Sequence, residues 1–368
     1  MIKTGYANLP LHSGSCPKWL FGRMKRLSSV ISEMIIDEYG TKEYLKRLSN
    51  PYFFQALSCV IGFDWHSSGT TTTTMGALKE SLNKMDLGIY IAGGKGGVSR
   101  KTPNEIKNFS DNFNLNENKI KKLVYSSKMS AKVDSAVLQD NYQLYHHCFV
   151  FTEKGNWAVI QQGMNVSSRY ARRYHWISDN VESFVNEPHN AICCDKKNKN
   201  TLNMTAKESE EARKISLDIV KDSPTHLKKY IKETTQKTLN DFNNKIIKFS
   251  MSPRHTIMDM NKKNIETLQK AYEIQPRTYE GLIAIKGVGP KTIRSLALIS
   301  ELVYGAKASW KDPVKYSFAH GGKDGIPHPI NRKLMDDNTK LLQDAIRNAK
   351  LGNKDKLCAI KRLSNFYR

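Results

Sequence analysis

Carboxylates and histidines in the first half of the chain have the residue types that hydrolytic chemistry needs. Asp134 and Asp140 are six residues apart, and His147 follows in a segment of alternating polarity. Carboxylate oxygens and imidazole nitrogens bind divalent cations, and a bound Mg²⁺ or Mn²⁺ ion activates water for attack on a phosphodiester. We therefore expect a divalent metal site. Its expected ligands are Asp64, Asp134, Asp140 and His147, with His66 as a further catalytic residue and Lys132 as a stabiliser of transition-state charge.

The histidines belong to a predicted β-hairpin that is rich in polar side chains. Strands at 142–152 and 157–164 flank a turn centred on Lys154-Gly155, which places His147 opposite Gln162. Adjacent residues of a strand point to opposite faces, so only one of two neighbouring histidines serves a given face. Buried His and Gln side chains need partners. The hairpin therefore holds either a site or a satisfied internal network.

A glycine-rich segment, Gly93–Pro103, follows a short predicted strand at 87–92. Its glycines leave backbone N–H groups open to an anion, and cations and hydroxyls lie among them. The spacing differs from that of a Walker A loop. The segment predicts a phosphate-binding loop, with an ordinary surface loop as the alternative. Its expected phosphate contacts are Lys95, Ser99, Arg100 and Lys101.

Arginines and aromatic residues are densest between Arg169 and Trp176. Guanidinium groups and aromatic rings together contact phosphates and stack on unpaired bases. We expect Arg172 and Arg173 to bind nucleic acid in this way. The alternative is a helix that buries its aromatic rings and solvates its arginines.

The segment 282–305 predicts two helices joined by a tight Gly287-Val288-Gly289 turn. Pro290 suits the first position of the second helix, and Gly305 is a plausible stop. The open N–H groups of that first turn, with Lys291 beside them, form an anion site. This pattern is typical of a helix-hairpin-helix motif, which holds nucleic-acid phosphates without reading sequence; the alternative is a glycine-capped hairpin in a core. The expected contacts are Gly287, Gly289, Lys291 and Thr292.

The periodicity of apolar residues divides these segments between two predicted domains. Residues 1–204 form a mixed α+β domain with a β-hairpin or small sheet, and residues 205–368 form an all-α nucleic-acid-binding domain, so the fold class is α+β. Ser67 or Asp64 is a candidate cap for the helix at 75–85. The other helices are expected at 17–39, 42–48, 52–61, 116–127, 208–220, 225–242, 262–272 and 340–350.

The composition favours a polyanionic partner. The 368 residues include 58 Lys and Arg against 35 Asp and Glu, a net charge of +23, and the 39% hydrophobic content is enough for packed cores. Because there is no long apolar run or signal-peptide core, we expect no membrane partner and a cytoplasmic location. The six cysteines lack the spacing of a metal site.

Several segments spread along the chain resemble one family, the prokaryotic and chiefly archaeal domain-of-unknown-function family 763. The resemblance lies in residues 4–12, 62–69, 92–103, 130–134, 138–147, 157–165, 206–213, 286–291 and 316–327. It implies a helix-hairpin-helix module and a nuclease activity.

Three functions are consistent with these features. The leading one is a metal-dependent nuclease with a Mg²⁺ or Mn²⁺ cofactor, acting in DNA repair on DNA or RNA, with DNA favoured. The second is a helix-hairpin-helix glycosylase/lyase in which Lys291 attacks a sugar and Asp312 assists. The third is a nucleic-acid-binding scaffold without enzymatic activity. The sequence does not distinguish single from double strands, and it leaves the oligomeric state open.

Overall fold

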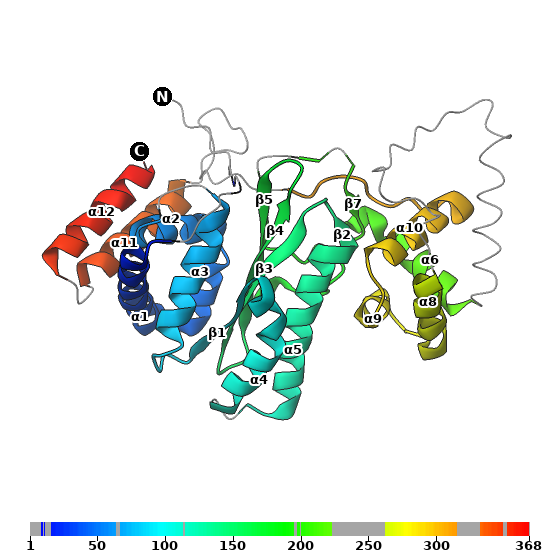
Figure 1. The fold of residues 1–368 in the computed structure, drawn as a ribbon, viewed down its shortest axis with the longest axis horizontal. Helices are drawn as coiled ribbons and strands as arrows, with labels where there is room; N and C mark the ends of the chain where they lie inside the picture. The colour runs from blue at the N-terminus through cyan, green and yellow to red at the C-terminus, as the bar shows by residue number, and fades with distance from the viewer. Residues whose placement is uncertain are drawn as a thin grey trace.

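The computed structural model describes residues 9, 11, 16–63, 67–112, 115–194, 197–198, 200–222, 262–314, 332–348 and 352–367. A five-stranded antiparallel sheet runs through the middle of the molecule (Figure 1). Helices cover both of its faces, so the fold is mixed α+β, as the sequence predicts. The strand order is β1 (Ile89–Lys95), β3 (Gln143–Thr152), β4 (Trp157–Asn165), β5 (Tyr170–Ile177) and β6 (Ala191–Cys193).

The β3–β4 hairpin forms where it is predicted, but its register is shifted by one residue. His147 lies opposite Gln161, and His146 lies opposite Gln162. The N–H of Thr152 donates to the carbonyl of Asn156 at 3.0 Å, which makes the loop three residues long instead of two. Gly155 takes φ +86° in this loop, as three-residue hairpin loops require. The expected pairing of His147 with Gln162 is therefore wrong.

Three helices cover one face of the sheet: α1 (Lys18–Leu48), α2 (Pro51–Ile61) and α3 (Ser68–Leu82). The two helices predicted at 17–39 and 42–48 are one element, kinked at Gly40 with φ +81°. Every residue of α2 is buried, as its apolar sequence predicts. The side chain of Ser67 caps α3, which therefore begins seven residues earlier than expected and includes the threonine run.

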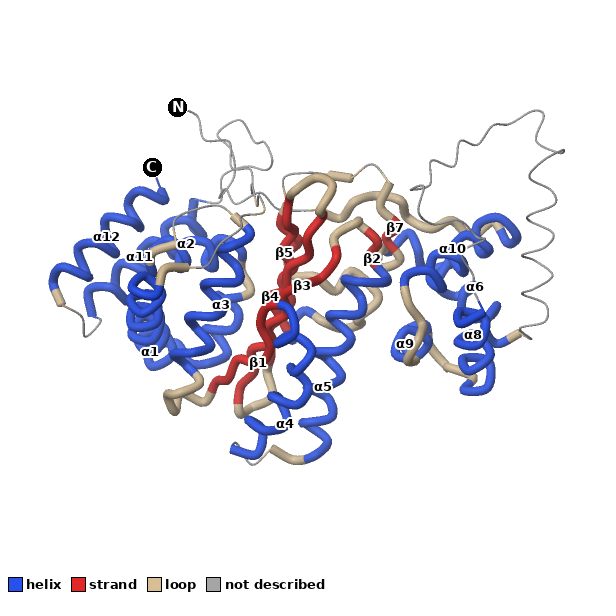
Figure 2. Tube along the Cα trace, in the orientation of Figure 1, coloured by secondary structure: helices blue, strands red, loops and turns tan. Residues whose placement is uncertain are grey.

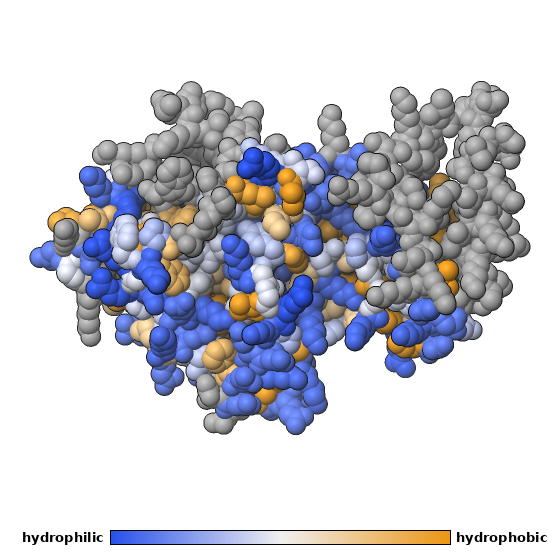
Figure 3. All heavy atoms as spheres, viewed as in Figure 1, coloured by the Kyte–Doolittle hydropathy of each residue, from blue (hydrophilic) through white to orange (hydrophobic). Residues whose placement is uncertain are grey.

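Two helices cover the opposite face: α4 (Thr102–Asn112) and α5 (Glu117–Lys132). A 3-10 segment, Gly96–Lys101, leads into α4, and a π-helical turn, Val133–Val137, ends α5. The chain then enters β2 (Leu138–Gln139), which pairs with β7 (Leu202–Asn203). The surface over α4 and α5 is predominantly hydrophilic (Figure 3).

A group of helices lies beyond α5, on the side away from α1–α3 (Figures 1 and 2). Its members are α6 (Glu210–Lys221), α8 (Lys262–Ile274), α9 (Tyr279–Ala284) and α10 (Pro290–Tyr304). Two short 3-10 turns lie in the connections of the chain: Ser178–Asn180 follows β5, and Lys207–Ser209 leads into α6. The helix expected at 225–242 lies outside the described residues.

The last two helices return to the first layer. α11 (Arg332–Asn348) and α12 (Asn353–Tyr367) pack beside α1 and α2 (Figure 1). Their apolar residues Leu342, Ile346 and Leu363 share one core with α1–α3 and one face of the sheet. The other face shares its core with α6 and α8–α10. The sheet thus divides the two cores.

Candidate functional site

Asp134 is the centre of a buried polar network on the sheet face that α5 covers. The π-helical turn at the end of α5 turns this carboxylate inward, where it is fully buried. Oδ2 accepts hydrogen bonds from the side-chain amide of Gln161 and from Nε1 of Trp176, the latter at 2.9 Å. Oδ1 contacts Nε2 of His189. Both oxygens of this buried carboxylate therefore have polar partners, as buried polar groups require.

His189 is the functional candidate that the sequence does not reveal. It lies in the connection between β5 and β6, 55 residues from Asp134 along the chain. Its ring packs on that of Trp176, with 4.5 Å between the centroids. The side chain remains 8% exposed while that of Asp134 is 0% exposed. A lone histidine in a polar connection has no local pattern that would mark it.

His147 joins the same network but is fully occupied. Nδ1 contacts Oε1 of Gln161 at 2.7 Å, and Nε2 contacts the hydroxyl of Ser127 at 2.9 Å. Burial lowers its pKa, with hydrogen bonding to Gln161 and the charge of Asp134 opposing the shift. With both ring nitrogens engaged, His147 has no lone pair available for a metal. The geometry makes it a structural link between α5 and the sheet, and it does not fit its expected role as a ligand.

Asp140 belongs to a separate buried cluster built on Arg172. Nη1 of Arg172 lies 2.9 Å from Asp140 and Nη2 lies 2.7 Å from Asp312, and all three side chains are at most 2% exposed. The hydroxyl of Tyr174 also donates to Asp140, at 2.7 Å. Burial lowers the pKa of Arg172, but the charges of Asp140, Tyr174 and Asp312 outweigh it and hold that pKa well above its ordinary value.

This cluster corrects three expectations. Asp140 is an ion-pair partner and does not fit the predicted roles of metal ligand or catalytic acid. Arg172 is fully buried, so it is not a surface contact for nucleic acid. Asp312 ties the segment after α10 to β5, which leaves the lyase alternative without its aspartate.

Arg173 points to the other face of β5 and is also buried. Its Nε donates to Nε2 of His175 at 2.9 Å, and its Nη1 donates to the hydroxyl of Thr71 at 3.3 Å. The guanidinium lies 4.5 Å from the ring centroid of Phe54 in α2. Burial lowers the pKa of Arg173 to about 10. The expected role in base stacking is therefore wrong for Arg173, and the segment is a strand where the alternative was a helix.

The glycine-rich segment splits into a strand end and an exposed 3-10 turn. Lys95, Arg100 and Lys101 are exposed, and Ser99 is half-buried with its hydroxyl bonded to the carbonyl of Gly96 at 2.6 Å. Gly93 belongs to β1, and a Cβ there would lie 2.1 Å from the carbonyl oxygen of His147. The three cations are therefore accessible to an anion. Gly93, by contrast, is required by the sheet, because the backbone of β3 leaves no room for a side chain there.

The predicted helical hairpin is present with its expected turn. Gly287 takes φ +102°, and a Cβ there would lie 2.9 Å from Oγ1 of Thr267 in α8. Pro290 is the first residue of α10, and Gly305 ends that helix with φ +72°. Beside the turn, Lys286 and Lys291 are exposed and Gly289 is half-buried. The side chain of Thr292 is 1% exposed, so it is not an external contact.

Two side chains, Lys132 at the end of α5 and Gln139 in β2, fix this hairpin to the rest of the fold. Nζ of Lys132 donates to the carbonyl of Ile285 at 2.7 Å, and the side-chain amide of Gln139 donates to the carbonyl of Pro290 at 2.8 Å. Burial lowers the pKa of Lys132. Its ammonium thus lies on the hairpin and caps the end of α9, and no contact to Asp134 is present among the described residues.

No group of three or more His, Cys, Asp or Glu side chains forms a possible metal site in the part of the chain that the structure describes. Asp134 and His147 share Gln161 as a neighbour, whereas Asp140 pairs with Arg172. Asp64 and His66 lie outside the described residues. Among the described helices, none is both long enough and apolar enough to cross a membrane.

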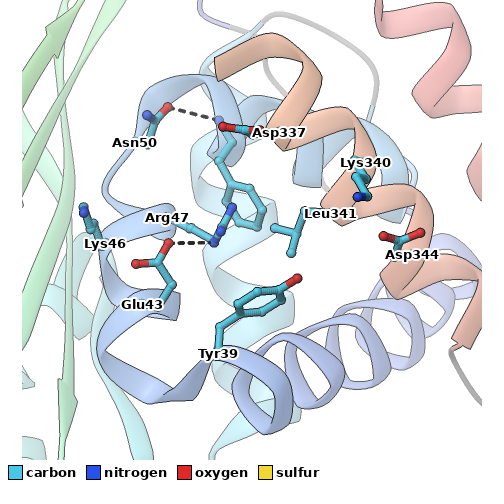
Figure 4. Close-up of a pocket in the computed structure, with 10 residues that line it drawn as sticks. Tyr39, Glu43, Lys46, Arg47, Asn50, Asp337, Lys340, Leu341 and Asp344 are labelled. Carbon is cyan, nitrogen blue, oxygen red and sulfur yellow. Dashed lines mark hydrogen bonds and ion pairs between the residues drawn. The ribbon is translucent and has the colours of Figure 1, made fainter. Parts of the chain in front are cut away.

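A cavity of about 380 Å³ lies between α1, the start of α2 and α11 (Figure 4). Positive and negative side chains line it in equal number: Lys46, Arg47 and Lys340 against Glu43, Asp337 and Asp344. Arg47 and Glu43 pair with each other at 3.0 Å across its wall. Because its charges balance, this cavity has no electrostatic preference for nucleic acid.

By fold and site, the chain is a mixed α+β protein in which a helical hairpin with an exposed turn is fixed beside the contact between His189 and Asp134. It matches the family model described as "Protein of unknown function (DUF763)" over residues 5–330 and belongs to that family. No curated protein and no solved structure matches it.

Proposed function

We propose that the protein binds nucleic acid without sequence preference, through the α9–α10 hairpin acting as a helix-hairpin-helix motif. The observation that carries this proposal is the exposed Lys286–Lys291 turn at the start of α10. The first N–H groups of a helix have no acceptor within it, and its N-terminus carries partial positive charge. The two exposed flanking lysines, Lys286 and Lys291, add positive charge to this anion site.

The neighbouring helix α5 extends this basic surface. Lys121, Tyr125, Lys128 and Lys132 recur at the spacing of one helical face. Lys132 contacts the hairpin directly, and the hydroxyl of Tyr125 donates to Glu280 of α9 at 2.7 Å. Lys121 and Lys128 are exposed on the same face. A backbone of phosphates that leaves the hairpin along α5 would therefore meet further cations, in keeping with the net charge of +23.

Fluorescence anisotropy with labelled DNA and RNA, as single strands and duplexes, tests this proposal. The double variant Lys286→Glu/Lys291→Glu should bind all of them at least ten-fold more weakly than the wild type, because repulsion replaces two phosphate contacts. Lys84→Ala is the matched control, since this exposed lysine follows α3 on the opposite side of the sheet. Equal affinities for the double variant and the wild type would reject the hairpin as the binding surface.

Hydrolysis of the bound phosphodiester is the second candidate function, and the His189–Asp134 pair favours it. Histidine oriented by a buried carboxylate is a common general base. A metal-dependent form with Mg²⁺ or Mn²⁺ would need ligands among residues such as Asp64 and His66, because Asp140 and His147 are engaged elsewhere. If the wild type binds nucleic acid without cleaving it in Mg²⁺, Mn²⁺ or chelator, the protein is a binding scaffold.

A further inference from the structure

We propose that His189 and Asp134 form a general-base site for phosphodiester hydrolysis, with Nδ1 of His189 taking the proton of the attacking water. This inference rests on the proposed nucleic-acid binding, because it needs a bound strand as substrate. His189 is the catalytic residue, and Asp134 is the residue that positions it.

The hydrogen bonds around Asp134 fix which nitrogen of His189 is the base. Oδ2 already accepts from Gln161 and Trp176, and Oδ1 faces Nε2 of His189. A buried carboxylate in this position accepts the N–H of Nε2, so the proton lies there and Nδ1 carries the lone pair. No hydrogen bond occupies Nδ1 among the described residues, which leaves it open to a water molecule.

The contacts of His189 differ from those of the three histidines in the described strands. His146, His147 and His175 are buried, with exposures between 0% and 6%. His147 has both nitrogens engaged, and His175 accepts from Arg173 at 2.9 Å. The His189 side chain is 8% exposed and its Nε2 contacts the carboxylate of Asp134, with no hydrogen bond at Nδ1 among the described residues. This is the arrangement that proton transfer to and from solvent requires.

The connection that carries His189 is fixed to the proposed binding hairpin. The N–H of Phe184 donates to Oε2 of Glu280 in α9 at 3.3 Å. Near Asp134, the ammonium of Lys132, two residues earlier in the chain, donates to the carbonyl of Ile285. Both members of the pair are therefore anchored to the hairpin by neighbouring residues. A strand held at Lys286 and Lys291 would lie on a hairpin that is hydrogen-bonded to the segments carrying the base and its carboxylate, which favours a fixed geometry for attack.

The reaction balances with water as the only co-reactant. Nδ1 of His189 accepts a proton as the water oxygen forms a bond to phosphorus. The ester P–O bond breaks, and the leaving oxygen takes a proton from solvent. Asp134 stabilises the imidazolium until it returns its proton to solvent.

The His189→Gln variant tests the base while preserving the network. The amide of glutamine can still donate to Asp134, but it offers no basic nitrogen in place of Nδ1. Glu182→Gln is the matched control, because it is an exposed residue of the same connection. Affinity is measured by anisotropy and cleavage by gel, on short labelled DNA and RNA with Mg²⁺, with Mn²⁺ and with chelator. Thermal unfolding of each variant monitors the fold.

We expect His189→Gln to bind as the wild type does and to cleave at least about 100-fold more slowly, as loss of a general base predicts. Added imidazole should restore part of the cleavage to His189→Ala, which a purely structural role would not allow. Cleavage by His189→Gln within about two-fold of the control would overturn the inference. A wild type that binds but never cleaves overturns the inference alone, whereas a wild type that fails to bind overturns the proposed function as well.

Discussion

Replacement of Asp312 by alanine separates a structural from a catalytic role for this carboxylate. Asp312 accepts hydrogen bonds from Nη1 and Nη2 of Arg172 at 3.0 and 2.7 Å. It also accepts from the backbone N–H groups of Asn198 at 2.7 Å and Val314 at 3.1 Å. The alanine variant removes all four interactions from a side chain that is 2% exposed.

The expected loss follows from what remains after the substitution. Removing one partner of a buried ion pair costs about 3–5 kcal/mol, because the other charge is left unpaired. Here Asp140 still lies 2.9 Å from Nη1 of Arg172, so the guanidinium keeps one carboxylate. We therefore expect the lower end of that range, about 3 kcal/mol. This is a large share of the 5–15 kcal/mol that typically stabilises a folded protein.

Urea unfolding followed by tryptophan fluorescence measures this loss. Glu208→Ala is the control, since Glu208 pairs with Lys311 at 3.4 Å on the surface, where the two side chains are 62% and 83% exposed. The control should cost below about 1 kcal/mol. A loss of less than about 1 kcal/mol for Asp312→Ala would refute the structural role of the ion pair between Asp312 and Arg172. Unchanged stability together with lost strand cleavage would instead support the lyase role.

Three further predictions follow from the hairpin, α5 and a buried histidine. Gly287→Ala should bind DNA more weakly and melt at a lower temperature than the control Gly97→Ala. The backbone φ of +102° at Gly287 costs a residue with a Cβ about 1–2 kcal/mol, whereas a Cβ at Gly97 meets nothing within 4 Å. Lys128→Ala should make the negative slope of log K against log[salt] shallower by about 0.9, and an unchanged slope would place α5 outside the interface. Burial lowers the pKa of His146 to about 3, so as the pH falls this histidine is protonated in the unfolded chain before it is protonated in the folded chain. Stability should therefore fall as the pH drops from about 6.5 toward 3, and urea unfolding should show a shallower fall for His146→Leu; an identical fall would contradict this assignment.

The parts of the fold that local chemistry determines could be predicted from the sequence. Gly287, Pro290 and Gly305 mark the hairpin because each has a backbone preference that only such a turn satisfies. The all-apolar run of α2 likewise predicts a buried helix. The register of β3 and β4 could not be predicted, because the residues around Gly155 are compatible with both two-residue and three-residue hairpin loops.

The roles of the polar residues depend on contacts that are distant in sequence. Arg172 and Arg173 look like a basic surface because nothing nearby reveals that Asp312 lies 140 residues away or that Phe54 covers the other face. His189 escapes notice for the same reason, since only its contact with Asp134 distinguishes it. A carboxylate in sequence can become a ligand, an ion-pair partner or an orienting group, and the fold decides among them.

The return of α11 and α12 to the first helices has a consequence for the order in which this protein is made. Leu342, Ile346 and Leu363 complete the core around α1 and α2, but they leave the ribosome some three hundred residues after those helices begin. Until then, the apolar faces that will contact them have no partner in the nascent chain, and such surfaces are prone to aggregation. The core around α1 and α2, which are synthesised first, is thus completed only after α11 and α12 have been made.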